Sequence, residues 1–499
     1  MRRSHPPAPQ EVALSSPAPT SRSRLIETAG IEIIPESART ATPRQLFWPW
    51  FAANVSVFGM SYGAFVLGFG ISFWQATVVS IVGIVISFAL CGLVAIAGKR
   101  GSAPTMVLSR AAFGVEGNKV PGVVSWLVSI GWETSLAITA VLATSTIFER
   151  LGLDGGTGTK LVATIVVAAL IVGASVLGYH TIMKLQSWLT WITGAITVLY
   201  LFMALPHVDF SAVGAVPNGS AAHMIGALVM VMTGFGLGWI NIAADWSRYQ
   251  HRNASDASIV AWNTIGGAAA PIILVIVGLL LAASDADFAA NVGGDPVGAL
   301  ASILPTGILI PFLITAILAL VSGAVLGIYS SGLTLLSLGI KVPRPAAAGI
   351  DGLILTVGTL FVVFVAQDFI GPFQSFLITL GVPLASWAGL LIADVLRRRK
   401  PYAEEELFDK RGRYGSWDAV SIVTLIVTSV IGWGLVVNTF AEAAAWNNWQ
   451  GYLLGPLGLG GREGDWAYAN LGVLLALVLS FLVGYFVRAP KIAAQEAKG

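Results

Sequence analysis

Long apolar stretches follow one another from Phe47 to about Arg488, and they constrain the fold more than any other feature of the chain. A helix needs about 20 mostly apolar residues to cross a bilayer. Twelve stretches approach or exceed this length, at 47–70, 74–97, 121–148, 160–178, 186–205, 223–246, 258–282, 305–338, 349–367, 373–395, 417–439 and 466–488. They do not alternate as the strands of an outer-membrane barrel would. The pattern predicts an all-α polytopic membrane protein with 12 transmembrane helices.

Composition and motif searches exclude several classes of function. Charged residues make up 11% of the chain, against roughly 25% in soluble domains. The net charge is only +2, so nucleic-acid binding is not expected. The single cysteine, Cys91, excludes a disulfide framework and any multi-cysteine metal site. Because no Walker motif, nucleophile elbow or HExxH motif is present, we expect neither an enzyme nor a cofactor.

The basic residues predict the orientation in the membrane. With the N-terminus inside, 25 of the 28 lysine and arginine residues lie in the predicted cytoplasmic segments. The other three, Arg150, Lys160 and Arg462, lie outside. This bias follows the positive-inside rule. We therefore expect a multi-pass protein of the plasma (inner) membrane with both termini in the cytoplasm.

These boundaries divide the chain into five segments. Residues 1–46 are rich in proline, serine and arginine, and we expect a disordered cytoplasmic tail. The others are a ten-helix core at 47–395, a cytoplasmic loop at 396–416, two accessory transmembrane helices at 417–488 and a cytoplasmic tail at 489–499. The stretch 305–338 exceeds one straight crossing. We expect it to begin as an interfacial helix, with Pro311 at the joint.

Two glycine clusters lie in the first and sixth predicted spans, which begin two halves of five helices each. The clusters are Gly59, Gly63, Gly68 and Gly70, and Gly234, Gly236 and Gly238. Interrupted helices at matching positions of two halves are typical of a transporter's binding site, where unwound backbone can bind substrate and cation. The alternative is that these small residues only allow close helix packing.

Glu133 is the acidic residue that lies deepest in a predicted span, about 18 Å along the helix axis from its start. A charge at that depth usually faces a cavity and serves the function. The indole of the preceding residue, Trp132, can stack on a flat heterocycle while the carboxylate accepts its N–H groups. Phe235 could cover the other face of the ring. The alternative is a protonated glutamate bonded to a neighbouring helix.

Five short motifs follow in a fixed order between about Ile31 and Lys400. They are Ser72-Phe73-Trp74-Gln75, Ser129-Ile130-Gly131-Trp132, Ala244-Asp245-Trp246-Ser247-Arg248-Tyr249, Ile328-Tyr329-Ser330-Ser331-Gly332-Leu333 and Ile392-Ala393-Asp394. Together they resemble the nucleobase–cation symporter-1 family, on its purine/cytosine permease branch. The resemblance implies a five-plus-five inverted-repeat fold of the leucine-transporter type with two extra C-terminal helices. It also implies uptake of a nucleobase or related ring by alternating access, driven by Na⁺ or H⁺.

The resemblance also implies a substrate site. Trp132 matches the family tryptophan that stacks on the ring, and Ser129 stands where bacterial cytosine permeases have a glutamine that hydrogen-bonds the base. The other matching positions are Val57 in the first span and Gly234, Phe235 and Gly236 in the broken stretch of the sixth. From its place in the first span, Asn54 is expected either to brace the unwound segment or to touch the substrate.

The family's Na⁺ site differs here. It uses backbone carbonyls and two adjacent hydroxyls, and the matching positions are Ala53, Ser56, Ala319, Ser322 and Gly323. Gly323 removes one hydroxyl, whereas a hard cation needs about five or six oxygens. Glu133 is a second departure, because bacterial cytosine permeases have an aromatic residue there. We therefore expect H⁺ as the coupling ion with Glu133 as the protonation site, and Na⁺ as the alternative.

The sequence thus predicts a secondary active importer, a symporter of a nucleobase-like heterocycle such as cytosine or a purine. Glu133 has two open roles, proton coupling and recognition of an aminopyrimidine edge. One alternative is a Na⁺-coupled transporter of another small heterocycle, such as allantoin, a hydantoin or a vitamin. Another is a membrane nutrient receptor, because fold does not fix function. The expected partners are the heterocycle and the lipid bilayer, and we expect a monomer.

Overall fold

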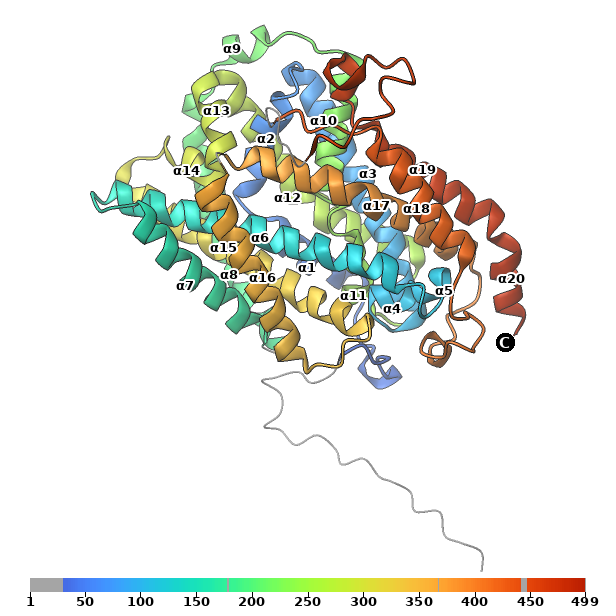
Figure 1. The fold of residues 1–499 in the computed structure, drawn as a ribbon. Coiled ribbons are helices and arrows are strands. Elements are labelled where there is room, and N and C mark those ends of the chain that lie inside the picture. The colour runs from blue at the N-terminus through green and yellow to red at the C-terminus, as the bar shows by residue number, and fades with distance from the viewer. Residues whose placement is uncertain (1–29, 177–178, 367, 441–446, 499) are drawn as a thin grey trace, which may run out of the picture.

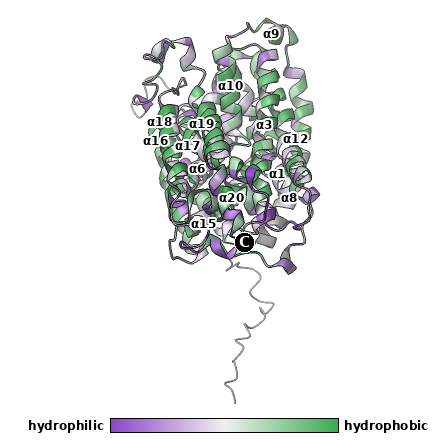
Figure 2. Ribbon diagram, turned by 90° about the vertical axis from the view of Figure 1, so that its right-hand side faces the viewer, coloured by the Kyte–Doolittle hydropathy of each residue, from purple (hydrophilic) through white to green (hydrophobic). Residues whose placement is uncertain are grey.

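The computed structural model describes residues 30–176, 179–366, 368–440 and 447–498. Within these ranges every regular element is a helix, apart from one isolated bridge between Ala41 and Gln250. The helices form one bundle (Figure 1). Hydrophobic residues dominate the body of the bundle and hydrophilic residues gather at its two ends (Figure 2). A protein embedded in a lipid bilayer has this distribution. The predicted class, an all-α membrane protein, is therefore confirmed.

Each predicted apolar stretch coincides with one helix or one broken helix. Eight helices of the described residues are long and apolar enough to cross a membrane. They are α3 (Phe73–Gly101), α6 (Lys119–Arg150), α7 (Thr157–Ser175), α8 (Tyr179–Ala204), α12 (Asp256–Ser284), α15 (Thr306–Ser337), α16 (Arg344–Val365) and α17 (Ile370–Arg397).

The remaining predicted spans are bent or short. Two bent pairs raise the count of candidate spans to ten. The first joins η2 (Pro43–Leu46) and α1 (Phe47–Asn54) to α2 (Phe58–Leu67), and the second joins α19 (Leu471–Leu482) and η9 (Val483–Val487) to α20 (Ala489–Ala497). Two apolar helices are shorter than a crossing, α10 (Ala221–Gly234) and α18 (Ala419–Trp433). The number of twelve crossings therefore stays a prediction.

The predicted joint at Pro311 is wrong. The helix α15 runs unbroken for 32 residues with Pro311 inside it. It packs along α6, which also has 32 residues. At 1.5 Å per residue each helix is about 48 Å long, which exceeds the roughly 30 Å hydrocarbon core. A long helix tilts or extends beyond the core instead of breaking.

Part of the predicted disordered tail is packed against the bundle. Arg39 is 1% exposed and donates hydrogen bonds to the carbonyls of Gln250, at 2.7 and 3.0 Å, and of Lys99, at 2.6 Å. It also contacts the hydroxyl of Ser102. This part of the tail is therefore fixed to the bundle, because the guanidinium binds one carbonyl in the last turn of α3 and one beyond the end of α11 (Ala243–Ser247). Residues 1–29 of the predicted tail lie outside the described residues.

The first broken helix is confirmed, but its break does not lie at the glycine cluster. The helices α1 and α2 meet at 69° across residues 55–57, where Val55 has φ −80° and ψ 62°. Gly63 lies further along, and a Cβ there would overlap the backbone of Gly278 and Leu279 in α12. Close packing therefore explains this glycine.

The second break falls inside its glycine cluster. The helix α10 ends at Gly234, and Phe235 has φ −118° and ψ −115°. A turn, the short η4 (Ile240–Ile242) and α11 follow. A Cβ on Gly234 would overlap the ring of Tyr62, and one on Gly238 would lie 2.8 Å from Trp132 Nε1. These glycines allow two aromatic rings to reach the broken backbone.

Candidate functional site

One cavity inside the bundle is lined by the two helix breaks together with the unbroken helices α6 and α15. It brings together nine of the residues predicted for substrate or cation: Ala53, Asn54, Ser56, Ser129, Trp132, Glu133, Gly234, Phe235 and Ala319. Its lining also includes residues for which the sequence predicted no role in a site, among them Tyr62, Leu136, Trp239 and Gly327. The two broken helices therefore place the residues predicted for substrate and for cation around the same cavity.

Three predicted residues are buried beside the cavity but are not part of its lining: Val57, Gly236 and Ser322. The N–H of Gly236 donates to Ser87 Oγ at 3.1 Å. A Cβ at this glycine would overlap the backbone of Ser87 and Phe88 in α3. Gly236 thus holds the broken segment against α3. Substrate contact by Val57 and Gly236, and cation contact by Ser322, remain predictions.

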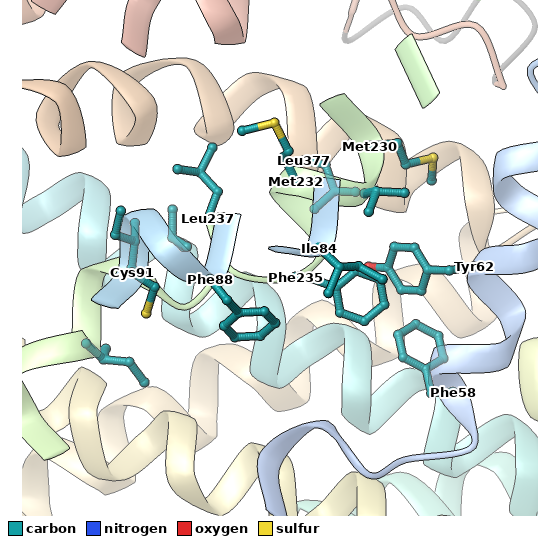
Figure 3. Packing of buried hydrophobic residues seen from close by; sticks show 14 of the residues in the cluster. Phe58, Tyr62, Ile84, Phe88, Cys91, Met230, Met232, Phe235, Leu237 and Leu377 are labelled. Atoms are coloured by element: carbon teal, nitrogen blue, oxygen red, sulfur yellow. The ribbon is translucent and has the colours of Figure 1, made fainter. Parts of the chain in front are cut away.

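The aromatic residues of the cavity are held by other rings. Trp132 packs edge-to-face against Phe373, with ring centroids 5.5 Å apart, and against Phe376, at 5.8 Å. Phe235 and Tyr62 lie side by side in Figure 3, tilted against each other with ring centroids 4.5 Å apart. Such contacts restrict the rings before any ligand arrives. Trp132 and Phe235, which we expect to cover the two faces of a planar ring, therefore line the same cavity, and neighbouring rings hold both side chains in place.

The polar groups of the lining are partly engaged with the protein. Asn241 Nδ2 donates to Ser129 Oγ at 3.2 Å and to Ser125 Oγ at 3.0 Å. Asn54 Nδ2 donates to the carbonyl of Trp50 at 2.8 Å. This bond braces the last turn of α1 next to the break. The position of Asn241 could not be read from helical spacing, because the backbone before it leaves the helix.

Glu133 differs from these polar groups. It is 0% exposed, and neither carboxylate oxygen has a hydrogen-bond partner among the described residues. Its side chain packs against α15, where a Cβ on Gly327 would lie 2.7 Å from Glu133 Cγ. A buried carboxylate without donors is costly. The site therefore requires a proton, a cation or a donor-bearing ligand at this position.

The predicted cation positions are partly assembled. Ala53, Ser56, Ala319 and Gly323 line the cavity, and the hydroxyl of Ser56 is buried without a partner among the described residues. Gly323 supplies no side-chain oxygen, and a Cβ there would lie 3.1 Å from Leu136 Cδ1. The described part of the chain has no cluster of three or more His, Cys, Asp or Glu side chains able to hold a metal.

Solved structures share this fold. Mhp1, a nucleobase-cation-symport-1 family transporter with bromovinylhydantoin bound, matches with a TM-score of 0.68 at 18% identity, over 94% of this chain and 98% of Mhp1. A Na⁺-coupled sialic acid symporter matches with a TM-score of 0.59 at 14% identity, over 91% of each chain. These likenesses confirm the predicted leucine-transporter type of fold.

Sequence relatives point to the same group. YxlA of Bacillus subtilis (strain 168), named as a purine-cytosine permease, is 23% identical over 414 residues, which cover 81% of this chain and 87% of YxlA. The purine-cytosine permease FCY21 of Saccharomyces cerevisiae is 26% identical over 265 residues, 50% of this chain and 47% of that protein.

The family described as "Permease for cytosine/purines, uracil, thiamine, allantoin" matches residues 33–455. This match includes both broken helices and all the residues that line the cavity. Permeases are transporters, so the prediction that the chain is not an enzyme is confirmed. The chain belongs to this permease family, the nucleobase–cation symporter-1 family.

Proposed function

We propose that this permease imports a nucleobase-like heterocycle, such as cytosine or a purine, together with protons. Trp132 and Phe235 cover the two faces of the ring, and Ser129 and the unwound backbone at Gly234 bind its edge. The protein acts by alternating access as a monomer in the plasma membrane, with both termini in the cytoplasm. The names of its relatives and the bias of its basic residues support this assignment.

The observation that carries the proton proposal is the state of Glu133. It lies in the lining next to Trp132, fully buried, without a hydrogen bond in the described structure. A proton neutralises such a group at the lowest cost. Substrate and proton then meet in one cavity, which allows the binding of one to depend on the other.

Glu133→Gln tests this role in proteoliposomes. We expect the variant to retain counterflow exchange of labelled base, and to lose accumulation under an inward proton gradient. Glu149→Gln is the matched control, because Glu149 lies on the same helix, exposed near the C-terminal end of α6. Accumulation equal to that of the wild type would overturn the proton role. An altered ranking of cytosine, adenine, hypoxanthine and uracil would assign Glu133 to recognition.

A second candidate is a Na⁺-coupled transporter of another small heterocycle. The unpartnered hydroxyl of Ser56 favours it, because this group lies where the family's cation site would be. Ser322, backbone carbonyls and water would complete the shell. Removal of Na⁺ decides between the candidates, since uptake that does not change without Na⁺ excludes this one.

A further inference from the structure

A second buried carboxyl group lies close to Glu133. Asp351 of α16 is 0% exposed. Its Oδ1 accepts a hydrogen bond from Trp126 Nε1 at 2.7 Å, and its Oδ2 accepts one from Ser331 Oγ at 2.6 Å. No basic side chain of the described residues forms an ion pair with it. Neither helix capping nor charge pairing explains an acidic residue buried at this position.

Ser331 connects the two carboxyl groups. It is 0% exposed and lies one helical turn after Gly327, the residue against which Glu133 packs. Residues four apart lie on the same face of a helix. Ser331 Oγ is hydrogen-bonded to Asp351, and Glu133 is close enough to Asp351 for the two carboxyl groups to interact electrostatically. The order in space is therefore Glu133, Ser331, Asp351.

This series leads from the cavity toward one end of the bundle. Asp351 lies seven residues after the start of α16, about 10 Å along its axis. Glu133 lies fourteen residues after the start of α6, about 21 Å along its axis. Both helices begin at the predicted cytoplasmic side. Asp351 is therefore the nearer of the two carboxyl groups to the cytoplasm.

The surroundings of Asp351 contain few other polar groups. The elements packed against α16 are α6, α7 and α15. The helix α6 supplies Trp126 and Glu133, and α15 supplies Ser331. From α7, Val172 packs at Gly352. Among the described residues, Glu133 is the titratable side chain that faces Asp351, and no other charged group acts on Asp351.

We propose that Ser331 and Asp351 form the proton exit from Glu133 to the cytoplasm. When the Glu133 carboxyl group turns into hydrogen-bond contact with Ser331 Oγ, it gives its proton to this oxygen while the Ser331 hydroxyl proton moves to Asp351 Oδ2. Ser331 stays neutral, Glu133 becomes the carboxylate, and Asp351 becomes the acid that then releases the proton to cytoplasmic water. Trp126 positions Asp351 through its N–H bond. This inference rests on the proposed proton coupling.

The test follows luminal acidification with a pH-sensitive dye in proteoliposomes, driven by whichever of cytosine, adenine, hypoxanthine and uracil the wild type accumulates. Asp351→Asn keeps the shape and can still accept the bond from Trp126 through its amide oxygen, whereas its amide nitrogen can only donate to Ser331 Oγ and cannot carry a proton. We expect acidification to fall by about tenfold or more, with counterflow exchange retained. Asp351→Glu should restore acidification, and Ser331→Ala should lower it. Asp287→Asn, at an exposed position of α13 (Ala286–Gly294), is the matched control.

The outcomes separate the two proposals. Wild-type acidification together with equal acidification by Asp351→Asn overturns the exit and leaves the proposed function intact. Loss of counterflow along with acidification in Asp351→Asn, without rescue by Asp351→Glu, assigns Asp351 a merely structural role and overturns the exit. Absence of acidification by the wild type, with substrate still taken up, overturns both proton coupling and the exit.

Discussion

At the scale of single residues, the account depends on how Glu133 is accommodated. Its carboxyl group is buried on the contact between α6 and α15, and Gly327 provides the space for it. A larger residue at 327 would force the carboxylate to move, and a buried acid that moves loses its relation to Trp132 and Ser331. The proposed role of Glu133 in proton coupling thus depends on the small size of Gly327.

Gly327→Ala tests this dependence. The new Cβ would lie 2.7 Å from Glu133 Cγ and 3.0 Å from its Oε1, so we expect Glu133 to shift. Accumulation against a gradient should fall by roughly tenfold, as a small misplacement of a functional side chain can cause. The measurement is accumulation relative to counterflow in proteoliposomes.

Gly332→Ala on the same helix is its control. A Cβ at this position would meet Ala347 Cβ at 3.9 Å, an ordinary contact. We expect this variant to accumulate substrate as the wild type does. If Gly327→Ala also accumulates normally, the close fit between Glu133 and α15 is not needed for coupling.

At the scale of elements, the broken helices show what the sequence could predict. The cluster at 234–238 marks a break, since three glycines in five residues weaken a helix and allow irregular backbone. In the first span the same reasoning misplaces the break, because Gly63 serves the contact between α2 and α12. Composition cannot distinguish the two uses of glycine. The distinction depends on which helix lies opposite, and only the structure shows that.

Gly63→Ala tests the packing role. Its Cβ would overlap the backbone of α12, which cannot yield as a side chain can. Overpacking of this kind costs about 1–3 kcal/mol, so we expect a lower thermal unfolding temperature in detergent. Gly173→Ala in α7 is the control, because a Cβ there meets nothing within 4 Å. Equal stability of both variants would show that α2 and α12 are not in close contact.

Asp351 shows the limit of sequence reasoning at the same scale. By its position it lies near the start of a span, where acidic residues commonly face water. Its burial follows from α16 packing against α6 and α15, which brings Trp126 and Ser331 to its two oxygens. No spacing within one helix predicts such a contact. Trp132, Glu133 and Phe235, in contrast, could be predicted because each is unusual within its own span.

At the scale of the whole molecule, a buried ion network connects the accessory helices to the core. Asp394 at the end of α17 binds Arg398, with oxygen–nitrogen distances of 2.9 and 3.0 Å, and Arg488, at 3.3 Å. Arg488 also binds Asp418, the N-cap of α18, at 3.3 Å. The network joins α17, α18 and the segment between η9 and α20. The last two predicted spans are therefore attached to the core by charge as well as by apolar packing.

Asp394→Asn should weaken this attachment. Asp394 is 0% exposed, and its loss would leave two buried guanidinium groups without their shared carboxylate. Breaking such a buried pair costs about 3–5 kcal/mol. We expect a clear drop in the thermal unfolding temperature of the purified protein in detergent.

Lys491→Met is the control for this network. Lys491 pairs with Asp418 at 2.9 Å, but its side chain is 42% exposed. The pair should contribute at most about 1 kcal/mol. If both variants unfold at the wild-type temperature, the buried network does not hold the accessory helices in place.

Uptake by the wild type in proteoliposomes tests the central claim most directly. Radiolabelled cytosine, adenine, hypoxanthine and uracil are each offered with an inward proton gradient without Na⁺, or with an inward Na⁺ gradient at equal pH. We predict accumulation of at least one base with the proton gradient alone. Accumulation only with the Na⁺ gradient would contradict the account, and would place a working cation site at Ser56 and Ser322 despite Gly323.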